Sequence, residues 1–362
     1  MPYLLNDIDR PVGGATIEWH AWIKGLISNN HEVGILTFKG ASAYIDRDLE
    51  FDIVESYSVN EGIPVLRWLY KRFPAIHNAV REYNPDFLIQ ECAGFETGLM
   101  AFIGKKMNIP FIYRVANDMD TDERYKERLS KYQQVAYKFG LKHADAIMCQ
   151  NNYQYERLKM KYPVKKITII HNPYFYEGEL SAIKNQTERK YIAWLGIFQY
   201  QKNLTALLEI VRSLGEIEFW IAGKAGNRLD DDTKAALSSL RNCNNVKFVG
   251  YLKRTEIMSF LSNAYALLNT SHYEGFSNTF LESFLAGTPV ITTDKVDPDS
   301  IVYNNNLGLT ARDYKEIPRL IVSMIQSSNY NNIAQSCRQY VLREHDPKML
   351  AQKFIEILDE LK

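Results

Sequence analysis

Short apolar runs alternate with longer amphipathic stretches along the whole chain. This alternation is typical of parallel strands joined by helical crossovers, because a strand covered on both faces is apolar throughout while its covering helix is apolar on one side. In the first half the runs predict strands at Tyr3–Leu5, Val33–Phe38, Phe87–Gln90, Phe111–Val115 and Ala146–Cys149. A helix is expected over Thr16–Ser28, whose apolar residues fall on one side. The pattern therefore predicts an α/β fold.

The pattern changes after the strand-like run Ile167–Ile170. His171-Asn172-Pro173 ends this run, and the polar stretch up to Lys190 has no clear periodicity, which is typical of an interdomain linker. Strands are predicted again at Tyr191–Leu195, Glu218–Ala222, Val246–Val249, Ala264–Leu268 and Pro289–Thr292. Each is followed by a plausible helix, so we expect a second doubly wound domain.

The length of 362 residues also favours two domains, because a single hydrophobic core rarely serves so long a chain. We expect one domain over residues 1–172 and another over residues 173–345. The remaining residues, 346–362, contain an amphipathic stretch that is long enough to pack back on the first domain. Open parallel sheets bind ligands at the carboxyl ends of their strands, so functional residues are expected in the loops after the strands.

Charge and cysteine content narrow the choice of partners. Lys+Arg and Asp+Glu both number 43, so no overall positive field would attract nucleic acid. The cysteines are Cys92, Cys149, Cys243 and Cys337; they form no Cys-x-x-Cys pair and fit a reducing cytoplasm. The sequence shows no signal peptide and no apolar run of the roughly 18 to 20 residues that a membrane span needs. We therefore expect a cytoplasmic protein.

Two basic and aromatic stretches, Arg67–Phe73 and Arg124–Lys142, bear on membrane contact. One interpretation is that both are solvated amphipathic helices. The other is that they lie on anionic lipid beside a lipid-linked acceptor, which would place the protein peripherally on the inner face of the membrane.

The most informative segment reads Glu274-Gly-Phe-Ser-Asn-Thr-Phe-Leu-Glu282. Its apolar spacing predicts a helix that begins near Asn278, and a helix start at a ligand site offers backbone N–H groups and a partial positive charge to a diphosphate. Glu282 lies one turn further on, where a carboxylate can accept hydrogen bonds from two ribose hydroxyls. Glu274 precedes the helix and would lie nearer a transferred sugar. The structural alternative is a capping box of Thr279 and Glu282, with Glu274 as a solvated loop acid.

The two glutamates, with seven residues between them, and the Ala-Gly-Thr-Pro-Val that follows resemble the signature of retaining glycosyltransferases of family 4. The resemblance covers nearly the whole chain and implies the GT-B architecture, in which two Rossmann-like domains face each other across a cleft. It implies that Glu274 contacts the donor sugar near the reacting centre and that Glu282 binds the ribose. It further assigns to donor binding Phe276, Ser277, Asn278 and Thr279, with the backbone of the last two on the diphosphate.

A second element, Trp194–Asn203, reads as a strand, a glycine loop and a helix start. Lys202 in this element is a candidate to neutralise the departing diphosphate, although a lone lysine is more commonly a surface residue. The family that the chain resembles usually pairs this lysine with an arginine directly after the glycine, and here that position is Ile197.

Three glycine-containing loops complete the predicted donor site. Gly223 follows the strand ending at Ala222 and would allow close approach of the nucleotide, or it forms a plain turn. Tyr251 and Leu252 resemble the loop that the family places around the nucleobase. The third loop contains Gly13 and Gly14, between the first strand and the first helix; it resembles the family's glycine loop, and it can also be a simple strand-to-helix turn.

Asn117 and Asp118 stand where many family members carry a histidine that touches the donor sugar, after the strand Phe111–Val115. Either of them is a candidate to take over that hydrogen bond. Asp118 and Asp120 also spell an acidic pair that binds metal in other glycosyltransferases. We expect no metal here, because exposed Asp pairs are common at loop starts and this pair lies in the other half of the chain from the donor signature.

The residues and the resemblance together imply an enzyme that transfers a hexose-type sugar, with retention, from a UDP- or GDP-type nucleotide sugar to a hydroxyl of a glycan or lipid-linked acceptor. Surface polysaccharide biosynthesis is the expected setting, with no cofactor beyond the nucleotide-sugar co-substrate. Two alternatives stay open. One is a sugar-nucleotide epimerase of the same architecture, and the other is a catalytically weak subunit that binds donor or glycan, which the isoleucine at position 197 and the absent histidine would explain.

Overall fold

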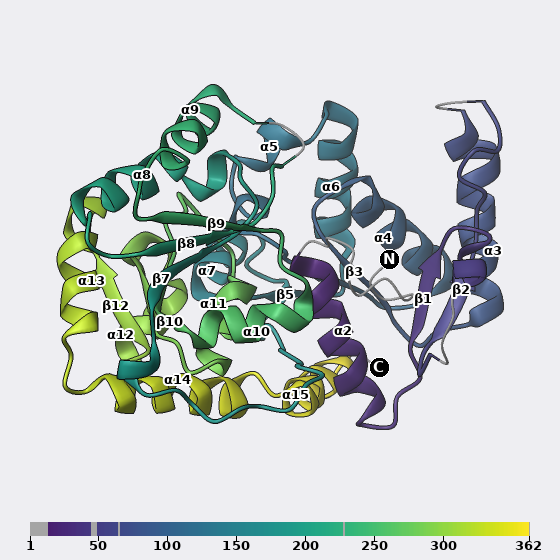
Figure 1. Cartoon of the computed structure of the whole chain (residues 1–362). Helices are drawn as coiled ribbons and strands as arrows, with labels where there is room; N and C mark the ends of the chain where they lie inside the picture. Colours follow the sequence, from purple (N-terminus) through teal and green to yellow (C-terminus); the bar gives the residue numbers. More distant parts are fainter. Residues whose placement is uncertain (1–13, 45–48, 64–65, 227–228, 362) are drawn as a thin grey trace. The chain divides into compact units, whose positions relative to one another are not determined.

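The structure is a computed structural model that describes residues 14–44, 49–63, 66–226 and 229–361. The predicted strand Tyr3–Leu5 and Gly13 lie outside these residues. The chain divides into two compact units (Figure 1). The first unit comprises Met1–Phe175 together with Asp346–Lys362, and the second unit comprises Tyr176–His345.

Among the described residues of the first unit, the strand pairs are parallel, as the alternation of apolar runs predicts. One sheet pairs β1 (Gly34–Thr37) with β2 (Asp52–Glu55), and another has the order β3 (Leu88–Glu91), β4 (Phe111–Arg114), β5 (Ala146–Cys149), β6 (Lys166–Ile169). The helices of this unit are α2 (Gly14–Ile27), α3 (Phe73–Tyr83), α4 (Phe95–Met107), α5 (Tyr125–Arg128), α6 (Lys131–His143), α7 (Asn152–Lys161) and α15 (Pro347–Asp359).

Strand β4 shows how this sheet separates two cores. Phe111 and Tyr113 are fully buried in the cluster that α4 and α6 build on one face. Ile112, which points the opposite way, is buried in a second cluster with Trp22 of α2 and Phe354 of α15. A strand covered on both faces is apolar at most positions, and this is why the central strands could be predicted from the sequence.

A buried ion pair fixes α2 against the carboxyl end of β4. The Arg114 guanidinium contacts the Glu18 carboxylate, and both side chains are almost fully buried. Arg114 also donates to Asn172 Oδ1 at 2.8 Å and lies 4.9 Å from the centre of the Trp22 ring. Removing either charge would leave the other buried without its partner, which typically costs about 3–5 kcal/mol.

The second unit is one parallel six-stranded sheet in the order β12-β11-β10-β7-β8-β9. Its strands are β7 (Tyr191–Leu195), β8 (Phe219–Ala222), β9 (Val246–Gly250), β10 (Ala264–Leu268), β11 (Val290–Thr293) and β12 (Gly308–Ala311). Its helices are α8 (Leu204–Ser213), α9 (Asp231–Leu240), α10 (Arg254–Ser262), α11 (Asn278–Leu285), α12 (Ile301–Asn304), α13 (Ile317–Ile325) and α14 (Tyr330–Glu344). Helices α8, α9 and α13 lie on one side of this sheet, and α10, α11 and α14 lie on the other (Figure 1).

The sequence located the central strands of both units to within one or two residues and missed two others. Strands β2 and β12 were not predicted. Both lie at the edge of a sheet, and the first begins and ends on an acidic residue. Short edge strands of mixed polarity lack the apolar run that identifies a buried strand. Within the described residues, every helix is too short or too polar to cross a bilayer.

The packing of α2 on α15 depends on a glycine. A Cβ added at Gly25 would lie 2.2 Å from the carbonyl oxygen of Pro347 and 2.9 Å from Cβ of Ala351. We predict that Gly25→Ala lowers the free energy of unfolding by about 1–3 kcal/mol, because the two helices must move apart. Urea denaturation would measure this loss, and amide exchange in α15 should become faster. Gly215→Ala is the matched control, since an added Cβ meets nothing within 4 Å there; equal stability losses in both variants would contradict the prediction.

Candidate functional site

The loop between β10 and α11, residues 269–277, carries the first glutamate of the predicted signature and is fixed by hydrogen bonds. Asn269 Oδ1 accepts from the backbone N–H of Ser271 at 2.9 Å. The Thr270 hydroxyl accepts from the Trp194 indole at 3.1 Å and donates to the Lys202 carbonyl at 2.8 Å. Strands β7 and β10 are neighbours in the sheet, so these contacts join the loops that follow them.

The structure brings the two predicted catalytic residues into direct contact. Lys202 Nζ lies 2.5 Å from Glu274 Oε1, and the side chains are 15% and 9% exposed. The Ser271 hydroxyl donates to the same oxygen at 2.6 Å, and the Gln201 side-chain amide donates to Glu274 Oε2 at 3.3 Å. A charge pair so little exposed interacts more strongly than a surface pair. Sequence reasoning named both charged residues but predicted neither their contact nor the supporting Ser271 and Gln201, because the contact depends on the strand order.

Helix α11 begins at Asn278, which confirms the predicted helix start. Ser277 is the N-cap residue, but its side chain makes no capping hydrogen bond to the helix backbone; its hydroxyl lies 2.8 Å from that of Thr279. Phe276 is buried, and its ring centre lies 5.2 Å from that of His345. The backbone N–H groups at positions 278 and 279, at the start of α11, are therefore the part of this segment that suits an anion. The Phe276 side chain instead packs inside the unit.

Glu282 is 3% exposed, and its carboxylate contacts the guanidinium of Arg254, the first residue of α10. Burial raises the pKa of Glu282, and the charge of Arg254 and its hydrogen bond oppose this rise. The capping-box alternative is wrong, because Thr279 follows the N-cap and Glu282 is paired with Arg254 instead. Sequence reasoning missed Arg254, since nothing in the local pattern connects α10 with α11.

Gly223 is required by the packing of the loops themselves. It has φ +149°, and an added Cβ would lie 1.8 Å from the carbonyl oxygen of Gly196. Its N–H donates to the carbonyl of Gly250 at 2.8 Å. The turn interpretation therefore has a structural basis, and contact of Gly223 with a nucleotide stays a prediction. Beyond Gly250, Tyr251 is 41% exposed and Leu252 is half-buried.

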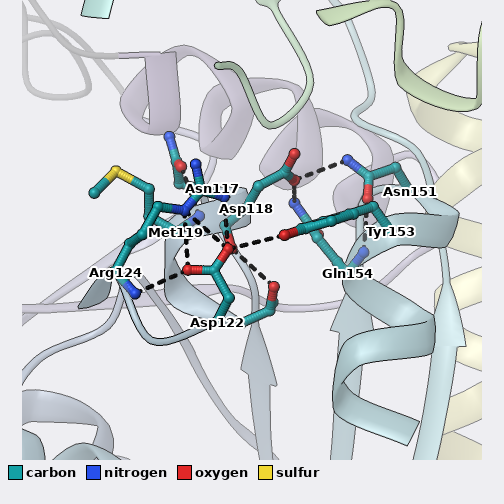
Figure 2. A network of polar contacts seen from close by, with 9 residues as sticks. Asn117, Asp118, Met119, Asp122, Arg124, Asn151, Tyr153 and Gln154 are labelled. Atoms are coloured by element: carbon teal, nitrogen blue, oxygen red, sulfur yellow. Dashed lines mark hydrogen bonds and ion pairs between the residues drawn. The ribbon is translucent and has the colours of Figure 1, made fainter. Parts of the chain in front are cut away.

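Asn117 and Asp118 lie in the first unit, directly after β4 (Figure 2). Asn117 Oδ1 accepts from the backbone N–H of Met119 at 3.0 Å. Asp118 Oδ1 accepts from the side-chain amides of Asn151 at 3.0 Å and Gln154 at 2.9 Å. The bonds of Asp118 fix the loop after β4 to the start of α7, and the bond of Asn117 lies within the loop itself. Both side chains therefore have a structural role, and sugar contact of either stays a prediction.

The second aspartate of this loop, Asp120, is paired with a cation. The Asp120 carboxylate contacts Arg128, and its backbone carbonyl accepts from the Tyr137 hydroxyl at 2.7 Å. Among the residues that the structure describes, no group of three or more His, Cys, Asp and Glu side chains is placed to hold a metal ion. Gly14, the remaining candidate of the first unit, is the first residue of α2.

The two basic and aromatic stretches are partly built into the first unit. Arg72 is buried, with its guanidinium 4.9 Å and 4.7 Å from the ring centres of Tyr57 and Trp68. In α6, by contrast, Tyr132 and Val135 are 67% and 70% exposed. The second stretch therefore presents apolar residues to the surface, and contact with a membrane stays a prediction.

Comparison with protein families places these parallel α/β units in one class of protein, the glycosyltransferases. The family described as "Glycosyltransferase Family 4" matches residues 12–174, and the family described as "Glycosyl transferases group 1" matches residues 178–340. The chain belongs to the group 1, or family 4, glycosyltransferases. It is an enzyme of the transferase class.

Similar proteins agree with this assignment. N,N'-diacetylbacillosaminyl-diphospho-undecaprenol alpha-1,3-N-acetylgalactosaminyltransferase of Campylobacter jejuni is 23% identical over 361 residues, which cover 94% of each protein. The Anabaena protein HepE, solved with UDP-glucose, has a TM-score of 0.72 at 15% identity, over 97% of both chains. WaaG, a glycosyltransferase involved in lipopolysaccharide biosynthesis, has a TM-score of 0.68 at 17% identity, over 96% of this chain and 97% of its own. The predicted α/β class and GT-B architecture are confirmed.

The network around Asp118 predicts an unusual dependence of stability on pH. Burial raises the pKa of Asp118 to about 6, against the opposing hydrogen bonds from Asn151 and Gln154. A carboxyl group whose pKa is raised by folding binds its proton more tightly in the native state. The contribution of Asp118 to stability therefore falls as the pH rises from about 4 to about 6, and it is constant above about pH 6. Asp118→Asn keeps an acceptor oxygen and abolishes this loss. We predict equal stability near pH 4 and a gain of about 1–3 kcal/mol at pH 7, measured by urea denaturation.

Asp122 is the control for this experiment. Burial would raise its pKa, but hydrogen bonds from Arg124 and the Tyr153 hydroxyl outweigh burial and lower it. Asp122→Asn should therefore destabilise the protein at pH 7, and the difference from wild type should shrink as the pH falls below the usual range of an aspartate. A difference between Asp118→Asn and wild type that does not change between pH 4 and 7 would contradict the prediction.

Proposed function

We propose that this chain transfers a hexose-type sugar, with retention at the anomeric carbon, from a UDP- or GDP-type nucleotide sugar to a hydroxyl of a glycan or lipid-linked acceptor. The observation that supports the donor chemistry best is the close pair of Lys202 and Glu274 beside the loop that leads into α11. The pair supplies a cation and a hydrogen-bond acceptor, and the helix start at Asn278 supplies a partial positive charge. A diphosphate with a sugar attached needs these complementary groups.

The similar proteins support the same donor and the same setting. HepE was solved with UDP-glucose, which makes a uridine nucleotide the first donor to test. The Campylobacter relative acts on a diphospho-undecaprenol-linked sugar, and WaaG takes part in lipopolysaccharide biosynthesis. Synthesis of a surface polysaccharide on a lipid-linked acceptor is therefore the proposed role.

The proposed reaction balances with the nucleotide sugar and acceptor alone. The bond between the anomeric carbon and the diphosphate oxygen breaks, and a bond from the acceptor oxygen forms on the same face of the sugar. The acceptor hydroxyl gives its proton to the departing phosphate. Lys202 and the start of α11 stabilise the negative charge that grows on the diphosphate. The Glu274 carboxylate accepts hydrogen bonds from the hydroxyl groups of the transferred sugar.

This function predicts that both members of the close pair are needed for turnover. Lys202→Ala should lower kcat by about 10²–10³-fold, because a cation near a departing diphosphate acts chiefly in the transition state. Glu274→Ala should lower it by a similar factor. Because the two side chains are in contact, the double variant should lose less than the product of the single losses. Turnover of a panel of UDP and GDP sugars, with lipid-linked glycans as acceptors, is the measurement.

Lys295→Ala is the control, since this lysine of the second unit is exposed. It should retain full activity. Turnover at the wild-type rate in Lys202→Ala and Glu274→Ala would refute the assignment of these residues. Activity is expected to survive a chelator, so a strict need for a divalent cation would contradict the metal-free mechanism.

Retention gives an independent prediction. The glycosidic bond of the product should have the same anomeric configuration as the bond to the diphosphate in the donor, because attack occurs on the face that the leaving group vacates. Proton NMR of the product from an α-linked nucleotide sugar would show an α-linked anomeric signal. A β-linked product would contradict retention, and an altered nucleotide sugar released without any acceptor would indicate an epimerase.

A further inference from the structure

An arginine, Arg254, contacts the buried carboxylate that is proposed to bind the donor ribose. Arg254 and Glu282 have side chains that are 14% and 4% exposed, and one guanidinium nitrogen, Nη1, contacts Oε1 of the carboxylate. The two residues lie on helices that pack against each other, α10 and α11. The contact therefore connects the element after β9 with the helix whose start is proposed to hold the diphosphate.

The position of Arg254 is set by the start of its own helix. Gly250, at the end of β9, has φ +78°, which turns the chain out of the sheet. Lys253 is the N-cap residue of α10, and its backbone N–H donates to the Glu256 carboxylate at 2.8 Å. Arg254 is the next residue, so the side chain starts from a fixed point and reaches across to α11.

A buried carboxylate and a diol interact well only when the carboxylate is ionised. An ionised carboxylate has about four acceptor positions, whereas a protonated one offers fewer and must place its own proton. Burial alone favours the protonated form of Glu282, and Arg254 counteracts burial through its charge and its hydrogen bond. Because Arg254 contacts Oε1 through one nitrogen, acceptor positions remain on the carboxylate for two hydroxyl groups.

We propose that Arg254 is a positioning residue for the donor: it holds the Glu282 carboxylate as an oriented anion that accepts hydrogen bonds from the ribose hydroxyls of a nucleoside diphosphate. This inference rests on the proposed function, in which Glu282 binds the ribose. The arginine acts through the carboxylate and not on the reacting atoms, so its loss should weaken recognition of the ribose in particular.

A comparison of ribo- and deoxyribonucleotides tests this role. The probes are UDP with 2'-deoxy-UDP, and GDP with 2'-deoxy-GDP; calorimetry gives Kd for whichever pair the wild type binds. In the wild type, removing the 2'-hydroxyl should raise Kd about tenfold or more, because a hydrogen bond to a charged acceptor is lost. In Arg254→Met this ratio should fall towards one, with weaker binding of the ribonucleotide. Arg254→Lys should keep an intermediate ratio, because it retains the charge but loses the planar fork.

The pH dependence separates this role from simple packing of α10 on α11. In Arg254→Met the preference for the ribonucleotide should return as the pH is raised, because Glu282 without its arginine ionises only at higher pH. In the wild type, where Arg254 opposes the effect of burial, the preference should depend less on pH than in the variant. A variant that lost only helix packing would bind both nucleotides more weakly by the same factor at every pH.

Two further variants complete the experiment. Arg241→Met removes an exposed arginine of the same unit, whose guanidinium lies 4.9 Å from the Phe248 ring, and should leave the ratio unchanged. Glu282→Ala should bind both nucleotides of a pair equally. If the wild type itself does not discriminate between them, the ribose role of Glu282 in the proposed function fails. If the wild type discriminates and folded Arg254→Met does so equally well, the role of Arg254 alone is overturned.

Discussion

Two contacts between a cation and a carboxylate, Lys202 with Glu274 and Arg254 with Glu282, determine the geometry of the candidate site. Both carboxylates are at most 9% exposed, and a charge removed from water so far is stable only beside an opposite charge. Lys202 and Glu274 lie in the connections after β7 and β10, whereas Arg254 and Glu282 lie in the helices α10 and α11. The pairing of β7 with β10 brings the two connections together, and the packing of α10 on α11 brings the two helices together, so the site exists only when the whole unit is assembled.

The first unit combines ion pairs with hydrogen bonds from neutral amides. Its buried ion pair, Glu18 with Arg114, lies between a helix and the central strand and belongs to the core. The loop after that strand is held by neutral amides that donate to Asp118 (Figure 2). Neutral donors oppose desolvation less effectively than a full charge, so the pKa of this carboxyl group lies near 6. The second unit pairs its two site carboxylates with cations, whereas in the first unit neutral amides hold Asp118, whose pKa is about 6.

Whether the local sequence pattern predicted a feature correctly depended on what that part of the chain packs against. The start of α11 was predicted at Asn278, because the apolar side of a helix and its terminating glycine are read from neighbouring residues. The capping box of Thr279 and Glu282 fits the same local rules and is wrong, because Glu282 forms an ion pair with Arg254 of another helix. Strands β2 and β12 escaped detection because an edge strand buries too little surface to need an apolar run.

The sequence by itself determined the α/β class, the central strands, the helix that carries the donor signature and, through the spacing of Glu274 and Glu282, the family. These features depend on residues close together in the chain, where periodicity and spacing carry the information. Only the tertiary structure decided that Lys202 pairs with Glu274 and that Arg254 pairs with Glu282. The partners in these two pairs are separated by 72 and 28 positions in the chain. The order of the parallel strands, which brings them together, cannot be predicted from any local sequence pattern.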